Sequence, residues 1–141
     1  MRAFTRPLLA IVALMTMFSL SAAAQEQTAE EIKAEKELYE SIEKEVDRLA
    51  SQLDLDDAQI FYVDSILVHD YKAMQAELKD LSNKKVSNAD IYYDVQYKWL
   101  DKIYYAYQKI FDEDQWAKYL KNGAERDKKA RDKKREKAGK K

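Results

Sequence analysis

Residues 25–122 contain neither glycine nor proline, and this absence limits the possible folds more than any other feature of the chain. The only proline is Pro7, and the two glycines are Gly123 and Gly139. Glycine and proline provide many of the tight turns that connect β-strands, whereas either residue weakens the interior of a long helix. The chain after its N-terminal segment is therefore predicted to be all-α.

Apolar residues recur at three- and four-residue steps in four segments: residues 29–53, 57–82 and 88–110, and a segment that begins after Asp112. This period predicts a helix in each segment. Thr28 and Glu31 have the spacing of a capping box at the first helix, and Ser87 or Asn88 is expected to cap the third. Because short connections favour antiparallel neighbours, we expect about four helices in elongated antiparallel hairpins.

The first 24 residues have the three-part pattern of a secretory signal peptide. Basic residues stand at Arg2 and Arg6, an apolar run occupies residues 8–20, and small residues follow at Ala22 and Ala24. A run of this length is shorter than the roughly 20 residues that span a membrane. We therefore expect cleavage after Ala24 and export of the mature chain.

The chain contains no cysteine, so neither a lipoprotein anchor nor a disulfide is expected. Exported proteins without disulfides are more typical of a bacterial periplasm than of a eukaryotic extracellular space. The predicted location is therefore the periplasm.

Charge divides the mature chain into an acidic helical domain, residues 25–125, and a basic tail, residues 126–141. The tail carries ten Lys or Arg against three acids and has no apolar face, so we expect it to be frayed or disordered at its end. Three roles compete for this tail: a solvated tail, an arm that touches anionic lipid or an acidic partner, and a nucleic-acid binder. Export argues against nucleic acid, and the solvated tail, with transient electrostatic contacts, is favoured.

The segment 88–110 carries more apolar surface than one partner helix can cover. One stripe comprises Ile91, Val95, Trp99, Ile103, Ala106 and Ile110. The second, called the Tyr-rich stripe below, comprises Tyr93, Tyr97, Leu100, Tyr104, Tyr107 and Phe111. Either this helix is packed on both sides within a bundle, or the Tyr-rich stripe contacts another protein. Tyrosine suits such a contact because its ring is apolar while its hydroxyl can remain hydrated.

The stretches "LDDAQ", residues 55–59, and "FDEDQ", residues 111–115, share one pattern: a large apolar residue, an Asp, two variable positions and a Gln. Each stands where a helix must begin. An Asp cap with Gln three positions later forms a capping box, and the apolar residue before the cap forms a staple with the fourth helical position. The pattern therefore predicts helix initiation by Leu55, Asp56 and Gln59, and again by Phe111, Asp112 and Gln115.

Two such units in a cysteine-free helical chain behind a signal peptide resemble the Spy and CpxP family of periplasmic proteins, whose signature is a pair of Leu-Thr-x-x-Gln motifs. The resemblance covers about residues 45–125, and it departs from the family by Asp for Thr in both copies and by Phe111 for Leu in the second. It implies a cradle-shaped antiparallel homodimer that binds unfolded or stressed envelope proteins without ATP, or that dampens an envelope stress sensor.

No enzyme activity is predicted. The one histidine, His69, has Ser65 one helical turn before it, which could suggest a nucleophile and its base. Both are expected on the solvated face, opposite Leu67 and Met74, and Asp70, as the next residue, is not expected to orient the ring.

No metal site or cofactor is predicted either. The mature chain offers one histidine, one methionine and no cysteine, which does not suit a soft metal. The acids at Asp54, Asp56 and Asp57 lack the spaced ligands and the glycine of a calcium loop. They are interpreted as favourable charge at a helix N-terminus.

The leading hypothesis is an ATP-independent periplasmic chaperone or stress-response module that binds clients on a surface including Tyr93, Tyr97, Leu100, Tyr104 and Tyr107. The alternative is a regulatory or adaptor protein that binds one specific envelope partner. A third possibility is a structural helical module whose aromatic stripe is entirely internal core.

Overall fold

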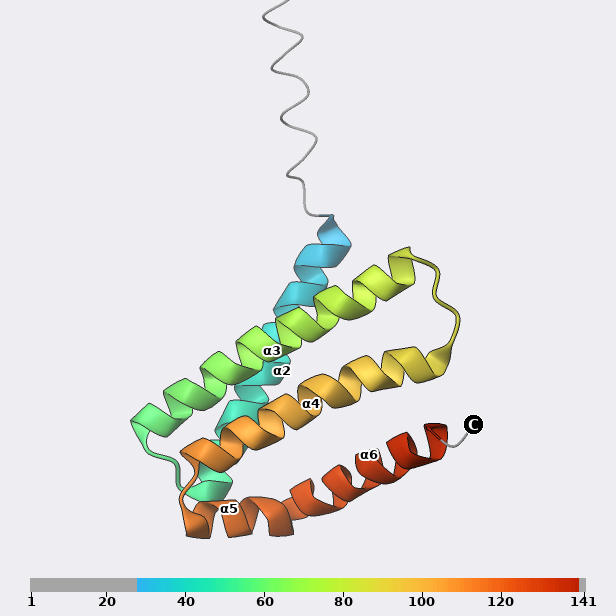
Figure 1. Cartoon of the computed structure of the whole chain (residues 1–141). Helices are drawn as coiled ribbons and strands as arrows, with labels where there is room; N and C mark the ends of the chain where they lie inside the picture. Colours follow the sequence, from blue (N-terminus) through green and yellow to red (C-terminus); the bar gives the residue numbers. More distant parts are fainter. Residues whose placement is uncertain (1–27, 140–141) are drawn as a thin grey trace, which may run out of the picture. The chain divides into compact units, whose positions relative to one another are not determined.

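The computed structural model describes residues 28–139, which form helices and no strand (Figure 1). The elements are α2 (Ala29–Leu53), α3 (Asp57–Asn83), α4 (Ala89–Ile110), α5 (Glu113–Tyr119), the π-helical turn η1 (Leu120–Ala124) and α6 (Glu125–Ala138). The all-α prediction is confirmed, α2, α3 and α4 begin and end within one residue of the predicted bounds, and α5 begins after Asp112 as expected. The predicted signal peptide, residues 1–24, lies outside the described residues.

The chain divides into two compact units, Met1–Leu38 and Tyr39–Lys141. In the first unit the described residues begin with the predicted capping box. The backbone N–H of Glu31 donates to Thr28 Oγ1 at 3.2 Å, and the N–H of Thr28 donates to Glu31 Oε2 at 3.2 Å.

Helices α3, α4 and α5 each begin after a residue with a polar side chain that caps the helix. Asp56 caps α3, Asn88 caps α4 and Asp112 caps α5, all three with extended backbone. Each side chain accepts a hydrogen bond from a backbone N–H of the first turn, which would otherwise have no partner. The caps explain why these helices begin where the sequence predicts.

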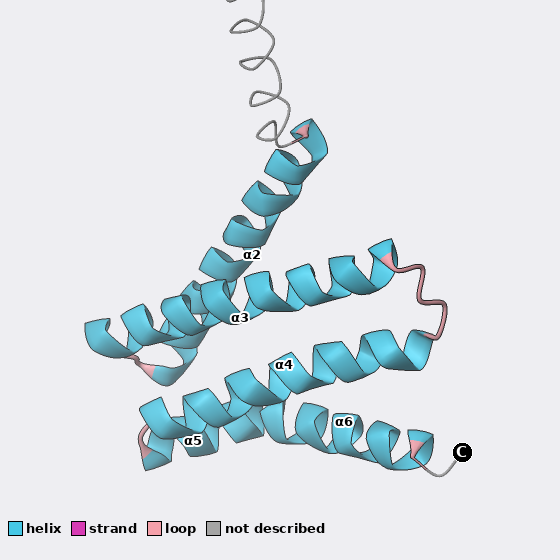
Figure 2. Ribbon diagram, turned by 45° about the horizontal axis from the view of Figure 1, so that its top comes forward, coloured by secondary structure: helices cyan, strands magenta, loops and turns pink. Residues whose placement is uncertain are grey.

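Helices α3 and α4 form an antiparallel hairpin, and α4 lies between α3 and the α5–α6 segment (Figures 1 and 2). The turn between α3 and α4 contains Lys85 in the left-handed region, with φ of 55°. Tyr92 donates from its hydroxyl to the carbonyl oxygen of Val86 at 2.8 Å, which fastens this turn to α4. Within residues 28–139 no helix combines the length and the apolar character needed to cross a membrane.

The core of the second unit is small and comes from α2, α3, α4 and the residue that follows α4. Its buried apolar residues are Ile42, Val46, Leu49, Leu53, Val63, Leu67, Val95, Ile103, Tyr107 and Phe111. Helix α4 contributes from both of its predicted stripes, because Val95 and Ile103 belong to one and Tyr107 to the other. Helix α4 is therefore packed on two sides, as its central position requires.

The basic tail is helical over most of its length. Residues 126–141 were expected to be frayed or disordered at their end; the structure has helix α6 over Glu125–Ala138, and residues 140–141 lie outside the described residues. None of its residues is buried, so apolar packing does not hold it in place. Instead Arg131 Nε donates to Asp101 Oδ1 of α4 at 3.0 Å, and Arg135 Nη1 donates to Asp101 Oδ2. Charge-assisted bonds of this kind are stronger than neutral ones and replace the missing apolar contacts.

Gly123 sets the direction in which α6 leaves α5. Its φ of 124° lies in a region that residues with a Cβ rarely adopt, and it interrupts the helical dihedrals inside η1. This break allows the chain to turn after α5 and run beside α4 (Figure 2).

Candidate binding site

Both predicted capping boxes are present. At the first, Gln59 N donates to Asp56 Oδ1 at 2.8 Å and Asp56 N donates to Gln59 Oε1 at 3.1 Å. At the second, Gln115 N donates to Asp112 Oδ1 at 2.8 Å and Asp112 N donates to Gln115 Oε1 at 3.0 Å. The prediction that these motifs initiate α3 and α5 is confirmed.

The two motifs also meet each other. Gln59 Nε2 donates to Gln115 Oε1 at 2.6 Å, and Gln115 Nε2 donates to Gln59 Oε1 at 3.0 Å. Each amide donates again to the carbonyl oxygen two residues before the other motif's cap, at Ile110 (3.0 Å) and at Asp54 (3.4 Å). We call this symmetric pair the amide clasp; it joins the start of α3 to the start of α5.

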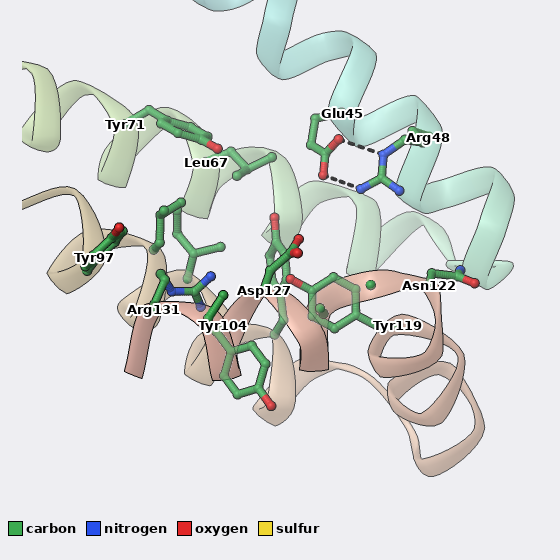
Figure 3. A pocket seen from close by; sticks show the side chains of 16 residues that line it. Glu45, Arg48, Leu67, Tyr71, Tyr97, Tyr104, Tyr119, Asn122, Asp127 and Arg131 are labelled. Carbon is green, nitrogen blue, oxygen red and sulfur yellow. Dashed lines mark hydrogen bonds and ion pairs between the residues drawn. The ribbon is translucent and has the colours of Figure 1, made fainter. Parts of the chain in front are cut away.

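A cavity of about 420 Å³ lies beside the core of the second unit (Figure 3). Five tyrosines line it: Tyr71, Tyr97, Tyr104, Tyr107 and Tyr119. Apolar surface comes from Leu67, Leu100 and Ile103, and part of the wall comes from η1 and α6. A concave, mostly apolar wall with a few polar groups is typical of a binding pocket.

Three tyrosines of this cavity, Tyr71, Tyr107 and Tyr119, have a raised pKa. Burial raises the pKa of Tyr107 well above its usual value, with smaller contributions from Tyr119 and Glu45. Burial and the nearby Glu45 carboxylate raise the pKa of Tyr119 to about 12 and also raise that of Tyr71. Each phenol is therefore a neutral group that can donate a hydrogen bond.

The hydroxyl of Tyr107 has no hydrogen-bond partner in the described part of the chain, although the residue is only 2% exposed. Its ring packs against Phe111 and Tyr119, with centroid distances of 5.1 and 5.6 Å. A buried polar group without a partner is uncommon because its lost hydration is not replaced. The hydroxyl is thus a buried donor without a partner, on a residue that lines the cavity.

The predicted client surface is divided by the structure. Tyr97, Leu100, Tyr104 and Tyr107 all line the cavity, and Tyr107 also belongs to the core. Tyr93 lies outside this cavity, 40% exposed, and stacks on Tyr97 with ring centroids 6.0 Å apart. The stripe is therefore neither wholly internal nor a flat open surface.

Basic side chains of α6 lie over Tyr93 and Tyr97, the first two residues of the Tyr-rich stripe. Lys134 Nζ lies 3.4 Å from the ring centroid of Tyr93 and 5.8 Å from that of Tyr97. Arg135 adds a third such contact, with its Cζ 5.7 Å from the Tyr97 centroid. Cations over aromatic faces are attracted by the ring quadrupole, so these contacts support the docking of α6.

Asp101 binds two arginines of α6. It was not among the residues predicted from the sequence to form a site. It is buried, at 9% exposed, and accepts from Arg131 and Arg135, while Lys128 Nζ lies 3.9 Å from its Oδ2. A signal was present, because Asp101 follows Tyr97 by four residues and so falls on the same side of the helix as the Tyr-rich stripe. A carboxylate in such a position requires a cationic partner when it is buried.

His69 differs in one respect from its prediction. The ring is exposed, as expected, but its Nδ1 lies 2.7 Å from Asp70 Oδ1, so the neighbouring aspartate does orient it. Asp70 is 4% exposed and its Oδ1 lies 3.3 Å from Lys102 Nζ. Ser65 Oγ donates to the carbonyl oxygen of Phe61 at 2.8 Å, which gives it a backbone partner within its own helix.

Among residues 28–139 no three His, Cys, Asp or Glu side chains gather in a way that could hold a metal ion. Comparisons of the chain with protein-family models, curated proteins and solved structures found no match. The resemblance to the Spy and CpxP family therefore rests on the two capping motifs and their setting.

Proposed function

We propose that the protein is an ATP-independent periplasmic chaperone or envelope-stress module that binds unfolded segments of exported proteins. The observation that carries the proposal is the position of the Tyr-rich stripe. Tyr97, Leu100 and Tyr104 line a cavity of about 420 Å³ and are not among the buried core residues. Aromatic rings with neutral hydroxyls can bind apolar segments of varied sequence, because the rings supply contact area and the hydroxyls adapt to nearby polar groups.

Exposed aromatic residues near the amide clasp support the same proposal. Phe61 and Tyr62, in the second turn of α3, are 66% and 53% exposed, and their rings meet edge to face with centroids 5.8 Å apart. A single exposed apolar residue is ordinary, but two large aromatic rings side by side provide a contact surface.

A direct test measures whether the mature protein suppresses the aggregation of a chemically denatured exported protein at near-equimolar ratio and without nucleotide. The expected result is suppression that the double variant Tyr97→Ser/Tyr104→Ser largely loses while its far-ultraviolet circular dichroism remains helical. Tyr39→Ser is the matched control, because Tyr39 is 42% exposed on α2 and does not line the cavity. Absence of suppression by the folded wild-type protein contradicts the proposal.

The alternative, an adaptor for one envelope partner, draws support from a different observation. A cavity of defined volume with one unused donor, the Tyr107 hydroxyl, suits a particular ligand better than it suits many. Binding measured against several unrelated unfolded proteins separates the two functions. Similar affinity for all of them favours the chaperone, whereas one stable partner and no general binding favours the adaptor.

A further inference from the structure

We propose that the tyrosine-lined cavity binds an uncharged aromatic or aliphatic side chain together with the carbonyl group beside it, as found in an apolar segment of extended polypeptide. This inference deepens the proposed function and rests on it for the source of the ligand. It specifies the chemistry that the cavity selects.

The size of the cavity is sufficient for such a group. Cavities of roughly 150 Å³ in other proteins accept benzene, and sites for small ligands are typically about 300–1,000 Å³. The volume of about 420 Å³ therefore holds a large side chain and part of its backbone. Leu67, Leu100 and Ile103 contact the apolar part of such a ligand, together with the faces of the tyrosine rings.

The charges of the wall exclude an ionised ligand. Four charged side chains line the cavity, and each has a partner within the chain. Glu45 accepts two hydrogen bonds from Arg48, at 2.6 and 2.8 Å. Arg131 donates to Asp101, and Asp127 accepts from Arg126 Nε at 3.1 Å. A charged ligand would lose its hydration here and find no free counter-charge, whereas a neutral ligand does not have this penalty.

The hydroxyl of Tyr107 supplies the selective contact. The hydroxyl is buried and has no partner among the described residues, and Tyr107 is one of the residues that line the cavity. Because it is protonated, it can donate to a carbonyl oxygen of the ligand and thereby gain the bond that it lacks. An apolar ligand without an acceptor leaves the hydroxyl unsatisfied and binds less well.

The test uses three soluble probes, with binding followed by the side-chain resonances of the cavity tyrosines. N-acetylphenylalaninamide is neutral and has both a ring and carbonyl groups. N-acetylphenylalanine carries a carboxylate at neutral pH, and N-acetylglycinamide has no side chain. We expect saturable binding of the first, at least tenfold weaker binding of the second, and no detectable binding of the third. Equal or tighter binding of the carboxylate overturns the proposal.

Two variants locate the site. Tyr107→Phe removes only the unpartnered hydroxyl and is expected to weaken the neutral probe about fivefold, the effect of one hydrogen bond, while Tyr39→Phe leaves its affinity unchanged. Leu100→Trp fills the cavity and is expected to abolish binding. Where circular dichroism shows that Leu100→Trp is unfolded, Ala130→Phe narrows the same cavity from α6. Unchanged affinity in Tyr107→Phe, or in a folded cavity-filling variant, overturns the assignment.

A competition experiment connects the cavity with clients and separates this inference from the proposed function. A saturating concentration of N-acetylphenylalaninamide is expected to reduce the suppression of client aggregation. Suppression that persists at full probe occupancy shows that clients bind elsewhere and overturns the cavity as their site. Probe binding by a protein that suppresses no aggregation contradicts the proposed function and identifies a free small molecule as the source of the ligand, which overturns the polypeptide assignment alone.

Discussion

The side-chain amides of Gln59 and Gln115 donate hydrogen bonds to each other, at 2.6 and 3.0 Å, although 56 residues separate them in the sequence. Each amide also accepts from its own cap N–H and donates to a carbonyl oxygen beside the opposite motif. All hydrogen-bonding positions of the two side-chain amides are used as a result. The two copies of the motif therefore form a single hydrogen-bonded contact between the starts of α3 and α5.

Replacing either glutamine of the amide clasp should cost more than removing an ordinary cap partner. We expect Gln59→Ala and Gln115→Ala each to lower the free energy of unfolding by about 2 kcal/mol, because each breaks several hydrogen bonds worth about 1 kcal/mol apiece. The double variant should fall short of the sum by about 1 kcal/mol, the coupling expected for side chains in direct contact. Urea denaturation measures all three, and Gln108→Ala, exposed on α4, is the control. Strict additivity would contradict a direct amide pair.

Threonine, the residue at this position in the Spy and CpxP motif, should be tolerated at both caps. Asp56→Ala and Asp112→Ala are each expected to cost about 1 kcal/mol, because a first-turn N–H loses its acceptor. Asp56→Thr and Asp112→Thr should retain most of that stability, since a threonine hydroxyl accepts the same bond. Thermal unfolding monitored by circular dichroism compares the four variants. A threonine variant as unstable as its alanine counterpart would argue that the carboxylate charge, not the cap bond, stabilises the helix.

Asp101 should control whether α6 is docked. We expect Asp101→Asn to weaken its charge-assisted bonds with Arg131 and Arg135 and to cost about 2 kcal/mol. Hydrogen exchange should then become fast across Glu125–Ala138 while α3 and α4 remain protected. Asp64→Asn, at an exposed position on α3, should leave the exchange of α6 unchanged. Slow exchange of α6 in Asp101→Asn would show that the cation–aromatic contacts are sufficient to dock it.

Stability should fall at alkaline pH over a defined interval. The pKa of Tyr119 is about 12 in the folded chain, above the ordinary value of 10, and those of Tyr71 and Tyr107 are also raised. Below pH 10 the phenols are protonated in both states and their contribution is constant. Between pH 10 and 12 only the unfolded chain releases these protons, so the free energy of unfolding decreases.

Urea midpoints at a series of pH values, with phenolate absorbance recorded in parallel, measure this decrease. Tyr119→Phe should make the decrease shallower, because one of the phenols with a raised pKa is removed. Tyr39→Phe serves as the control for the loss of a phenol outside the cavity. A profile with the same slope in Tyr119→Phe would show that Tyr119 ionises alike in both states.

Much of the fold could be predicted because its determinants are local. The lack of glycine and proline, the apolar period and the caps at Asp56, Asn88 and Asp112 act within one helix or across one turn. The pairing of Gln59 with Gln115 was not predicted, since a capping box relates residues three apart and contains no information about a second box. Its geometry depends on how α3 and α5 approach each other.

The packing of α6 against α4 was not predicted for a different reason. A segment without an apolar face gives no periodic signal, and α6 contacts α4 through Asp101 and through the rings of Tyr93 and Tyr97. The cavity was equally outside the reach of pattern analysis. Its tyrosines were recognised as a stripe, but its volume and the unpartnered hydroxyl of Tyr107 arise only from packing.

The amide clasp and the α6 contacts differ in their response to the solution. The clasp is made of uncharged groups, so neither ionic strength nor moderate pH change affects its electrostatics. The bonds of Asp101 with Arg131 and Arg135 are ionic, and because Asp101 is buried, salt weakens them less than it weakens exposed ion pairs. Helix α6 forms part of the cavity wall, so this part of the wall depends on ion pairs, whereas the connection between the starts of α3 and α5 depends on neutral amides.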